Sequence, residues 1–368
     1  MQLLEARPTP SNLMRYGAPL MATVLMFITG TILFLALGKN PIVAFEAFFV
    51  QPLLSVQGIS ELLLKASPLI LIGLGLSLCY RANVWNIGAE GQLVVGAICG
   101  GALAVVLEGS TSPLVLPAMV LVGALGGMAW AAICAFLKTR FGTDETLTSL
   151  MLVYVANLLL LFVVNGVLKD PQGMNFPQTI MFGDAALFTP LAEGLRLNTS
   201  VFITVVAVFA MWLFSTRSFV GYQMQVSGLA PHAALYAGFS QNRAVWLGML
   251  ISGAAAGIAG VAEVAGPIGQ LNPSISPGYG FAAIIVAWVG RLNAVGVVLA
   301  GSLMALLYIG GESAQVTLQI SNSITRLFQG MLLFYLLGAD VFVNYRLHRH
   351  YRHHRLLGWF GKRSGATT

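Results

Sequence analysis

The chain has 368 residues, of which 57% are hydrophobic and only 9% are charged, with a formal net charge of +6. A soluble domain carries about a quarter charged residues, so this composition excludes an ordinary soluble domain and indicates a protein of the lipid bilayer. The sequence has no G-x-x-x-x-G-K-[ST] phosphate loop, no residue arrangement typical of a catalytic nucleophile and no metal-ligand cluster. We therefore expect a membrane protein that is not an enzyme and needs no cofactor.

Ten apolar segments are candidates for membrane-spanning helices. A spanning helix needs roughly 20 apolar residues to cross about 30 Å of hydrocarbon. The segments lie at 18–37, 62–80, 88–107, 114–137, 146–168, 200–216, 244–266, 279–290, 294–311 and 323–342. We predict an all-α polytopic membrane protein of about ten helices, in which residues 1–342 form the membrane domain.

Lysine and arginine residues predict the orientation, because cytoplasmic loops are enriched in them. With the N-terminus inside, ten spans place most of the 19 basic residues on the inner side, and both termini are then cytoplasmic. The tail, residues 343–368, is rich in arginine and histidine. Its arginines at the inner surface favour contact with anionic lipid headgroups, and a metal site built from its histidines is the alternative.

The order of the spans predicts an inverted repeat. If the sixth span is a connector, spans 2–5 and 7–10 form two groups of four that run in opposite directions. In proteins of this kind the path of a solute lies near the midplane between the two halves. Span 8 follows the Gly/Pro-rich sequence "AGPIGQLNPSISPGYG", and its counterpart, span 3, follows a polar sequence. Interrupted segments at matching positions place both spans at such a path.

That polar sequence is "YRANVWNIGAEGQ", residues 80–92, between two apolar spans. A carboxylate deep in a span costs about 2.5–3.5 kcal/mol on insertion scales, so Glu90 is expected to face a polar cavity or partner. Asn86, Glu90 and Gln92 are therefore candidate pathway residues. The alternative is structural: if Asn86 caps span 3, Glu90 lies one turn inside the helix, where free N–H groups stabilise it.

Further polar residues lie within later spans. In span 5, Ser149, Asn157 and Asn165 recur every eight residues, which keeps them within one broad face. Such a stripe either hydrogen-bonds neighbouring helices or lines a polar path. Trp288 in span 8 and Glu263 near the outer end of span 7 present a similar choice, and Glu263 could instead reach water.

The inner connection, residues 217–243, contains no acidic residue and a short predicted helix. Pro231 suits the first turn of a helix and Gly238 suits the residue just past its end, so the sequence "HAALYA" between them is expected to be helical. A short helix held out into the cytoplasm between two spans has the shape of a docking element. A simple solvated connection is the alternative.

Four stretches resemble one family. "ANVWNIGAEGQLVVGA" is similar to the signature of permease subunits of bacterial ABC importers for nucleosides, within the superfamily of branched-chain amino acid and simple-sugar permeases. "TLTSLMLVYVANLLL" with "LKDPQG" resembles the family's fifth span and outer loop, "GLAPHAALYAGF" its cytoplasmic loop, and "GYGFAAIIVAWVGRLNAVGVVLAGSLMALL" its late hairpin. Val153 and Leu229-Ala230 depart from the family's usual pattern. The first departure leaves the solute open, and the second suggests a partner with its own matching surface.

The resemblance implies a pair of permease subunits, identical or related, in a bacterial plasma (inner) membrane. Two cytoplasmic ATPase subunits and an extracytoplasmic solute-binding protein would be the partners, with no nucleic acid. The solute would be a nucleoside, with simple sugars as the alternative. The ATPase-coupling residues would be Gly228, Pro231, His232, Ala233, Ala234, Tyr236 and Gly238, with His232 and Tyr236 as contacts. The pathway residues would be Asn86, Glu90, Gln92, Ser149, Asn157 and Trp288.

A secondary transporter driven by an ion gradient is the main rival hypothesis, because an inverted repeat and an intramembrane glutamate fit it too. The short cytoplasmic helix argues against this rival, since a self-sufficient carrier does not require one. An assembly protein without transport is poorly supported, because polar residues lie within the spans.

Overall fold

The computed structural model describes residues 4–6, 12–321, 323–324, 326–327, 330–331, 334–335, 338–339 and 345–347. The chain divides into two compact units, one made of residues 1–37 and 330–368 and the other of residues 38–329. The predicted tenth span and the basic tail fall largely outside the described residues.

The first unit contains the helix predicted as span 1. This helix, α1 (Asn12–Ala36), is apolar over the described part of its length. Two three-residue strands, β1 (Leu4–Ala6) and β2 (Tyr345–Leu347), pair antiparallel with Glu5 opposite Arg346. The first unit therefore brings together residues from the two ends of the sequence.

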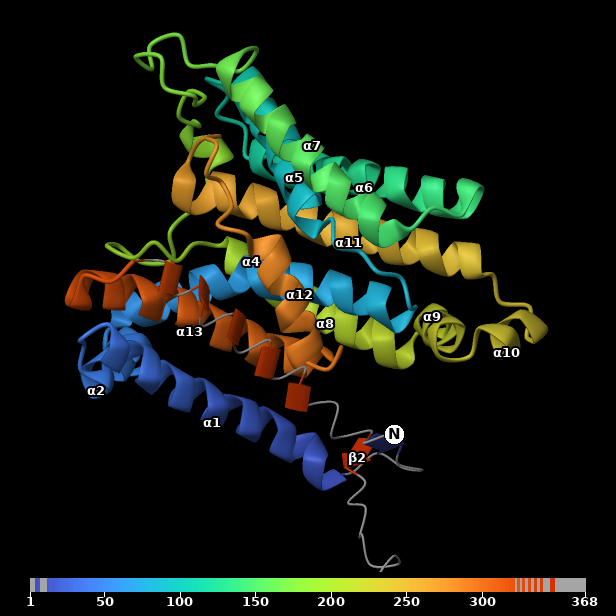
Figure 1. Ribbon diagram of the computed structural model, residues 1–368. Helices are drawn as coiled ribbons and strands as arrows, with labels where there is room; N and C mark the ends of the chain where they lie inside the picture. Colours follow the sequence, from blue (N-terminus) through green and yellow to red (C-terminus); the bar gives the residue numbers. More distant parts are fainter. Residues whose placement is uncertain are drawn as a thin grey trace, which may run out of the picture. The chain divides into compact units, whose positions relative to one another are not determined.

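The described part of the second unit is built from helices (Figure 1). They are α2 (Pro41–Phe45), η1 (Glu46–Val50), α3 (Gln51–Leu54), α4 (Val56–Arg81), α5 (Ala89–Val106), α6 (Val115–Phe141), α7 (Glu145–Asn165), η2 (Asp184–Ala186), α8 (Ser200–Arg217), α9 (Phe219–Leu229), α10 (Pro231–Tyr236), α11 (Gln241–Glu263), η3 (Val264–Ile268), α12 (Tyr279–Val289) and α13 (Ala294–Leu318). Seven of the described helices are long and apolar enough to cross a membrane: α4 to α8, α11 with η3, and α13.

The predicted spans 2–9 all appear as helices, α4 to α8 and α11 to α13. Two helical segments were not predicted. One is α2–η1–α3, residues 41–54, where apolar residues are interrupted by a π-helical turn and Pro52. The other is α9, which precedes the short predicted helix and fills much of a connection that the sequence suggested to be loop.

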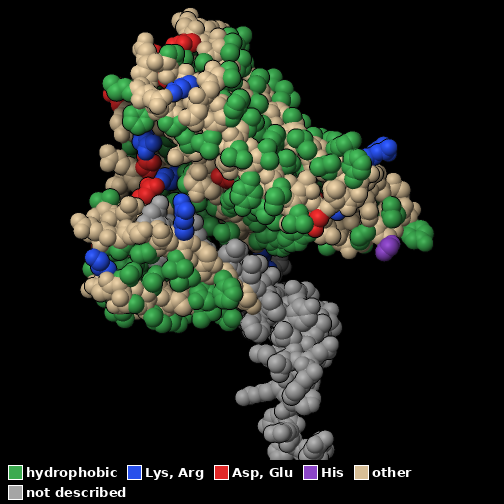
Figure 2. Space-filling view, turned by 45° about the horizontal axis from the view of Figure 1, so that its top comes forward, with side chains coloured by type: hydrophobic (Ala, Val, Ile, Leu, Met, Phe, Trp, Pro, Cys, Tyr) green, Lys and Arg blue, Asp and Glu red, His purple; other side chains and the backbone are tan. Residues whose placement is uncertain are grey.

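The centre of the second unit is formed by α4, α5 and their neighbours. The apolar window of α4 is 83% buried, whereas that of α8 is 17% buried, so α4 is central and α8 peripheral. The helices α5, α6 and α11 run alongside one another (Figure 1) and meet at glycines. A Cβ atom on Gly127 would lie 2.9 Å from the Cα atom of Gly257, so no side chain fits between α6 and α11. Hydrophobic side chains cover much of the outer surface (Figure 2), as expected for helices that face lipid.

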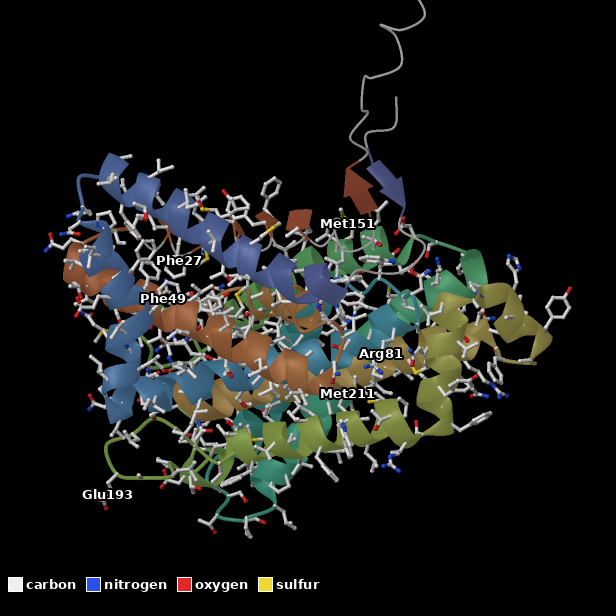
Figure 3. All side chains as sticks on the ribbon, turned by 90° about the horizontal axis from the view of Figure 1, so that it is seen from below. Phe27, Phe49, Arg81, Met151, Glu193 and Met211 are labelled. Carbon is white, nitrogen blue, oxygen red and sulfur yellow. The ribbon has the colours of Figure 1, made fainter. Side chains whose placement is uncertain are left out.

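The long loop, residues 166–199, packs against the helices through several buried residues. Thr179 is fully buried, and Phe182 and Phe188 are nearly so. The Phe182 N–H donates to the Gly269 carbonyl (2.8 Å) and the Phe188 N–H to the Ala265 carbonyl (2.9 Å). The long loop, in which Glu193 is labelled in Figure 3, and the α9–α10 segment lie at opposite ends of the helices.

Candidate functional site

The linker between α4 and α5, residues 82–88, forms the centre of the site. Helix α4 ends at Arg81, and Asn83 adopts a left-handed conformation (φ 56°). The Val84 N–H returns to the Cys79 carbonyl (2.9 Å), which is the usual way for a left-handed residue to close a helix end. The chain then enters the protein interior before α5 begins at Ala89.

Asn86 is the fully buried centre of a hydrogen-bonding network. Its Oδ1 atom accepts from the Gly88 N–H (3.0 Å) and from Gln92 Nε2 (3.1 Å). Its Nδ2 atom donates to Gln92 Oε1 (3.0 Å) and to Ser252 Oγ of α11 (3.0 Å). The alternative that Asn86 caps the third span is wrong, because the N-cap residue of α5 is Gly88 and the Asn86 side chain instead connects α5 with α11.

Glu90 lies in the first turn of α5 and is only 5% exposed. Its Oε2 atom accepts a hydrogen bond from the Gly280 N–H (2.6 Å), at the start of α12, and the Ser276 hydroxyl also bonds the carboxyl group. The N-termini of α5 and α12 thus meet at one carboxylate. Both helix ends present free N–H groups and a partial positive charge, so they stabilise the anion. The two spans that the sequence singled out as interrupted counterparts are therefore in direct contact.

The first turn of α7 holds the α4–α5 linker from the other side. Ser149 is buried, and its hydroxyl accepts from the Ile87 N–H (3.1 Å). Glu145 accepts from the Trp85 N–H (3.4 Å) and pairs with Lys138 of α6 (2.6 Å). Beside them, the Leu147 and Thr146 N–H groups hold the pKa of the exposed Asp144 carboxyl, the N-cap of α7, below its usual value.

Trp288 belongs to an aromatic cluster at the far end of α12. Its ring stacks on Trp85 of the linker, with centroids 5.5 Å apart and planes at 22°, and on Tyr80 of α4 at the same distance. The Tyr80 hydroxyl donates to the Asn86 carbonyl (3.1 Å). The cluster therefore joins α4, the linker and α12 within a few ångströms of the buried network.

Asn157 and Asn165 are not part of this assembly. Both are exposed on α7, and each amide donates to a carbonyl of its own helix, Asn157 to Val153 (3.1 Å) and Asn165 to Leu161 (2.8 Å). Of the stripe read from the sequence, only Ser149 is brought to the linker. The placement of Asn157 on a solute path stays a prediction.

Charged side chains gather at the end of the helices that carries the long loop, and Figure 2 shows acidic and basic side chains grouped along one side of the molecule. Lys65 of α4 pairs with Glu312 of α13, and Arg196 of the long loop pairs with Glu61 (3.4 Å). Glu263 is partly buried near these charges. Among the residues that the structure describes, no group of three or more His, Cys, Asp or Glu could hold a metal ion.

The short helix predicted at the opposite end is present as α10, with Pro231 in its first turn and Gly238 in a left-handed conformation (φ 76°) just past its end. His232, Ala233 and Tyr236 are exposed, and Tyr236 is 96% exposed, whereas Ala234 is fully buried. We call α9 and α10 together, residues 219–236, the coupling segment.

The sequence analysis did not single out α9, Ser252 or Glu145. Ser252 could have been noticed, because it is a hydroxyl residue within the run of small residues in its span.

Seven described helices that are long and apolar enough to cross a membrane, with buried polar and acidic residues between them, are typical of a multi-pass membrane protein. Residues 58–337 match the family described as "Branched-chain amino acid transport system / permease component", and the chain belongs to this family. The chain is a permease component of an ABC importer. Such components are not themselves enzymes, and the family implies ABC transporter partners such as an ATPase and a binding protein.

The chain is similar to permease proteins of several organisms. The glucose ABC transporter permease protein TsgB13 of Haloferax volcanii is 35% identical over 94% of this chain and 93% of its own length. The nucleoside ABC transporter permease protein NupB of Lactococcus lactis subsp. cremoris is 30% identical over 79% of this chain and 82% of its own. The guanosine ABC transporter permease protein NupP of Bacillus subtilis is 28% identical over 87% of this chain and 92% of its own.

One solved structure, PsaBC from Streptococcus pneumoniae in complex with Fab, aligns over 77% of this chain and 91% of that chain. The identity is 12% and the TM-score is 0.45, a likeness too low to carry an argument.

Proposed function

We propose that this chain forms a solute path together with a second permease subunit, while separate cytoplasmic subunits hydrolyse the ATP. The observation that carries the proposal is the junction at Glu90, where α5 and α12 meet. Helix α12 has 11 residues, which cover about 16 Å, roughly half of the hydrocarbon thickness. In this proposal the junction lies at membrane depth, where transporters with inverted repeats keep their solute path.

In this proposal the Glu90 carboxylate holds the closed arrangement of the path. Asn86, Gln92 and Ser149 fix the α4–α5 linker on one side of Glu90, and Trp288 closes the far end of α12. The bond from Gly280 to Glu90 must break or move when the helix N-termini separate. Asn157, on the exposed face of α7, is proposed to face the part of the path that the second permease subunit completes.

The solute is proposed to be a nucleoside. NupB and NupP are named for a nucleoside and for guanosine, and their identity extends over most of this chain. Glucose is the second candidate, because TsgB13, named for glucose, is the more identical relative at 35%. Both solutes carry a ring with several hydroxyl groups, which suits a path lined by amide and carboxylate oxygens.

The coupling segment is proposed to bind the ATPase subunits. Besides the exposed His232 and Tyr236, it presents Leu229 at 77% and Leu235 at 56% exposure. Exposed apolar side chains rimmed by polar ones mark protein interaction surfaces. A coupling segment of this kind would pass the closure of the ATPase dimer to the membrane helices.

The test is purification of the tagged chain from its native membrane, followed by identification of its partners and by uptake measurements in vesicles. We expect an ATPase to co-purify and ATP to drive uptake of labelled nucleoside. Replacing residues 228–238 with a Gly/Ser linker should abolish both, whereas the same replacement of residues 108–113, at the opposite end of the helices, should keep the ATPase bound. A chain that purifies alone and moves solute without ATP would establish the ion-driven carrier instead, and ATP-driven uptake of glucose alone would establish the second solute.

A further inference from the structure

The coupling segment rests directly on the end of α4. A Cβ atom on Gly228 of α9 would lie 2.9 Å from the Ala82 carbonyl carbon and closer still to the Arg81 carbonyl oxygen. Real Cβ atoms do not approach backbone atoms so closely, so the backbones of α9 and of the Arg81–Ala82 peptide are in contact with no side chain between them. A displacement of α9 toward α4 must therefore move this peptide.

Arg81 connects the same peptide to the end of α12. Its Nε atom donates to the Leu292 carbonyl (2.8 Å), which lies in the tight turn between α12 and α13. Leu292 and its neighbour Arg291 both adopt left-handed conformations (φ 55° and 52°), so the turn is sharply bent and presents this carbonyl to α4. Figure 3 labels Arg81 toward the end of the helices that carries α9 and α10.

The space beside this contact is not filled. A partly open pocket of about 280 Å³ is lined by the α4–α5 linker, by Ser227 and Pro231 of the coupling segment, and by the Lys138–Glu145 ion pair. This pocket between the linker and the coupling segment gives each of them room to shift relative to the other.

We propose that the Arg81–Ala82 peptide is the joint through which the coupling segment moves both helix N-termini at the Glu90 junction. When α9 moves, Gly228 displaces this peptide through their backbone contact. The α4–α5 linker transmits the displacement to α5, and the Arg81–Leu292 hydrogen bond transmits it to α12. Gly228 and Arg81 are positioning residues that need not contact the solute. The proposal rests on the proposed function, because it requires an ATPase that acts on the coupling segment.

Arg81→Lys in the complete complex is the decisive variant. Lysine keeps the positive charge, which favours a cytoplasmic position for this end of α4. It has no donor at the position of the arginine Nε atom. ATP hydrolysis and uptake are measured in the same proteoliposomes. We expect the ATPase to stay bound and to hydrolyse ATP, while solute moved per ATP falls about tenfold, within the usual range of coupling between sites. Arg217→Lys is the matched control, an exposed arginine at the end of α8, and should leave the ratio unchanged.

Gly228→Ala is the second variant, and Gly183→Ala, where an added Cβ meets no atom within 4 Å, is its control. A fall in the ratio for Gly228→Ala and Arg81→Lys but for neither control supports the joint. Wild-type ratios in both variants, with the ATPase bound and active, overturn the joint and leave the proposed function standing. A wild-type chain that binds no ATPase overturns both.

Discussion

Two segments lead into the helices that meet at Glu90: the α4–α5 linker precedes α5, and the α11–α12 loop precedes α12. We call them the lead-in segments, and they are held in different ways. The α4–α5 linker is fixed by buried side chains, with Asn86 bonded to Gln92 and Ser252. The α11–α12 loop, residues 269–278, is held at its start by backbone and side-chain bonds to the long loop. The Thr179 N–H donates to the Leu271 carbonyl (3.0 Å), and the Leu271 N–H donates back to the Thr179 hydroxyl (3.0 Å).

The two lead-in segments also contact opposite ends of the bundle. The linker contacts the coupling segment, whereas the α11–α12 loop contacts the long loop at the opposite end. The segments come together at Glu90, which Ser276 of the α11–α12 loop and the Gly280 N–H of α12 both bond. Contacts from both ends of the helices therefore converge on one carboxylate.

The largest effect is expected for Gly280→Ala, which should separate the two helix ends that both lead-in segments hold together. A Cβ atom there would lie 2.5 Å from the Glu90 Cα atom and 2.8 Å from the Ala89 carbonyl carbon, so the two helix ends could no longer meet. Overpacking of this kind costs about 1–3 kcal/mol. We expect a lower thermal midpoint in detergent and loss of uptake. Gly17→Ala, in open space on α1, is the control, and unchanged uptake by Gly280→Ala would mean that the closed junction is not needed.

Glu90→Gln keeps the shape of the junction but removes its charge. Hydrogen bonds to charged groups contribute about 1.5–3 kcal/mol, so uptake should fall by about tenfold or more while the amount of protein in the membrane stays the same. The exposed Glu108→Gln, beyond the other end of α5, is the matched control. Normal uptake by Glu90→Gln would leave stabilisation of the α5 N-terminus as the only role of the carboxylate.

The sequence predicted spans 2–9 and singled out the two segments that meet at Glu90, but not the contacts between them. Apolar length located the spans, and Pro231 with Gly238 bounded α10, because these signals are local. The bonds from Asn86 to Ser252 and from Gly280 to Glu90 join residues more than 160 positions apart. No local pattern specifies such partners. For the same reason the sequence left open whether Asn86 lines a path or caps the third span, and the structure has Gly88 at the N-cap position.

Asn86→Ala and Thr179→Val test whether the two lead-in segments are attached independently, because each variant weakens the attachment of one segment. Asn86→Ala leaves Gln92 and Ser252 without their buried partner, at a cost of about 1–3 kcal/mol. Thr179→Val removes the hydroxyl that accepts from the Leu271 N–H and donates to the Ile180 carbonyl, and the unpaired N–H gives a cost in the same range. Hydrogen exchange should rise in residues 82–88 for the first variant and in residues 269–278 for the second. Faster exchange in both segments from either change would contradict two separate attachments.

The smallest effect is expected for Asn157→Leu. The side chain is exposed and bonds only its own helix, so the free energy of unfolding should change by no more than about 0.5 kcal/mol. Uptake should fall by about twofold if Asn157 faces the shared path, because one polar contact is lost. Asn165→Leu, with the same kind of bond near the end of α7, is the matched control. Equal uptake by the two variants would remove Asn157 from the path.

The glycine contacts among α5, α6 and α11 bear on how such a protein can diverge. At Gly96, Gly127 and Gly257 backbone meets backbone, so the closest approach of the three helices depends on the absence of side chains there. A substitution that changes a lipid-facing side chain elsewhere on these helices leaves this approach untouched, whereas any added side chain at the three glycines separates the helices.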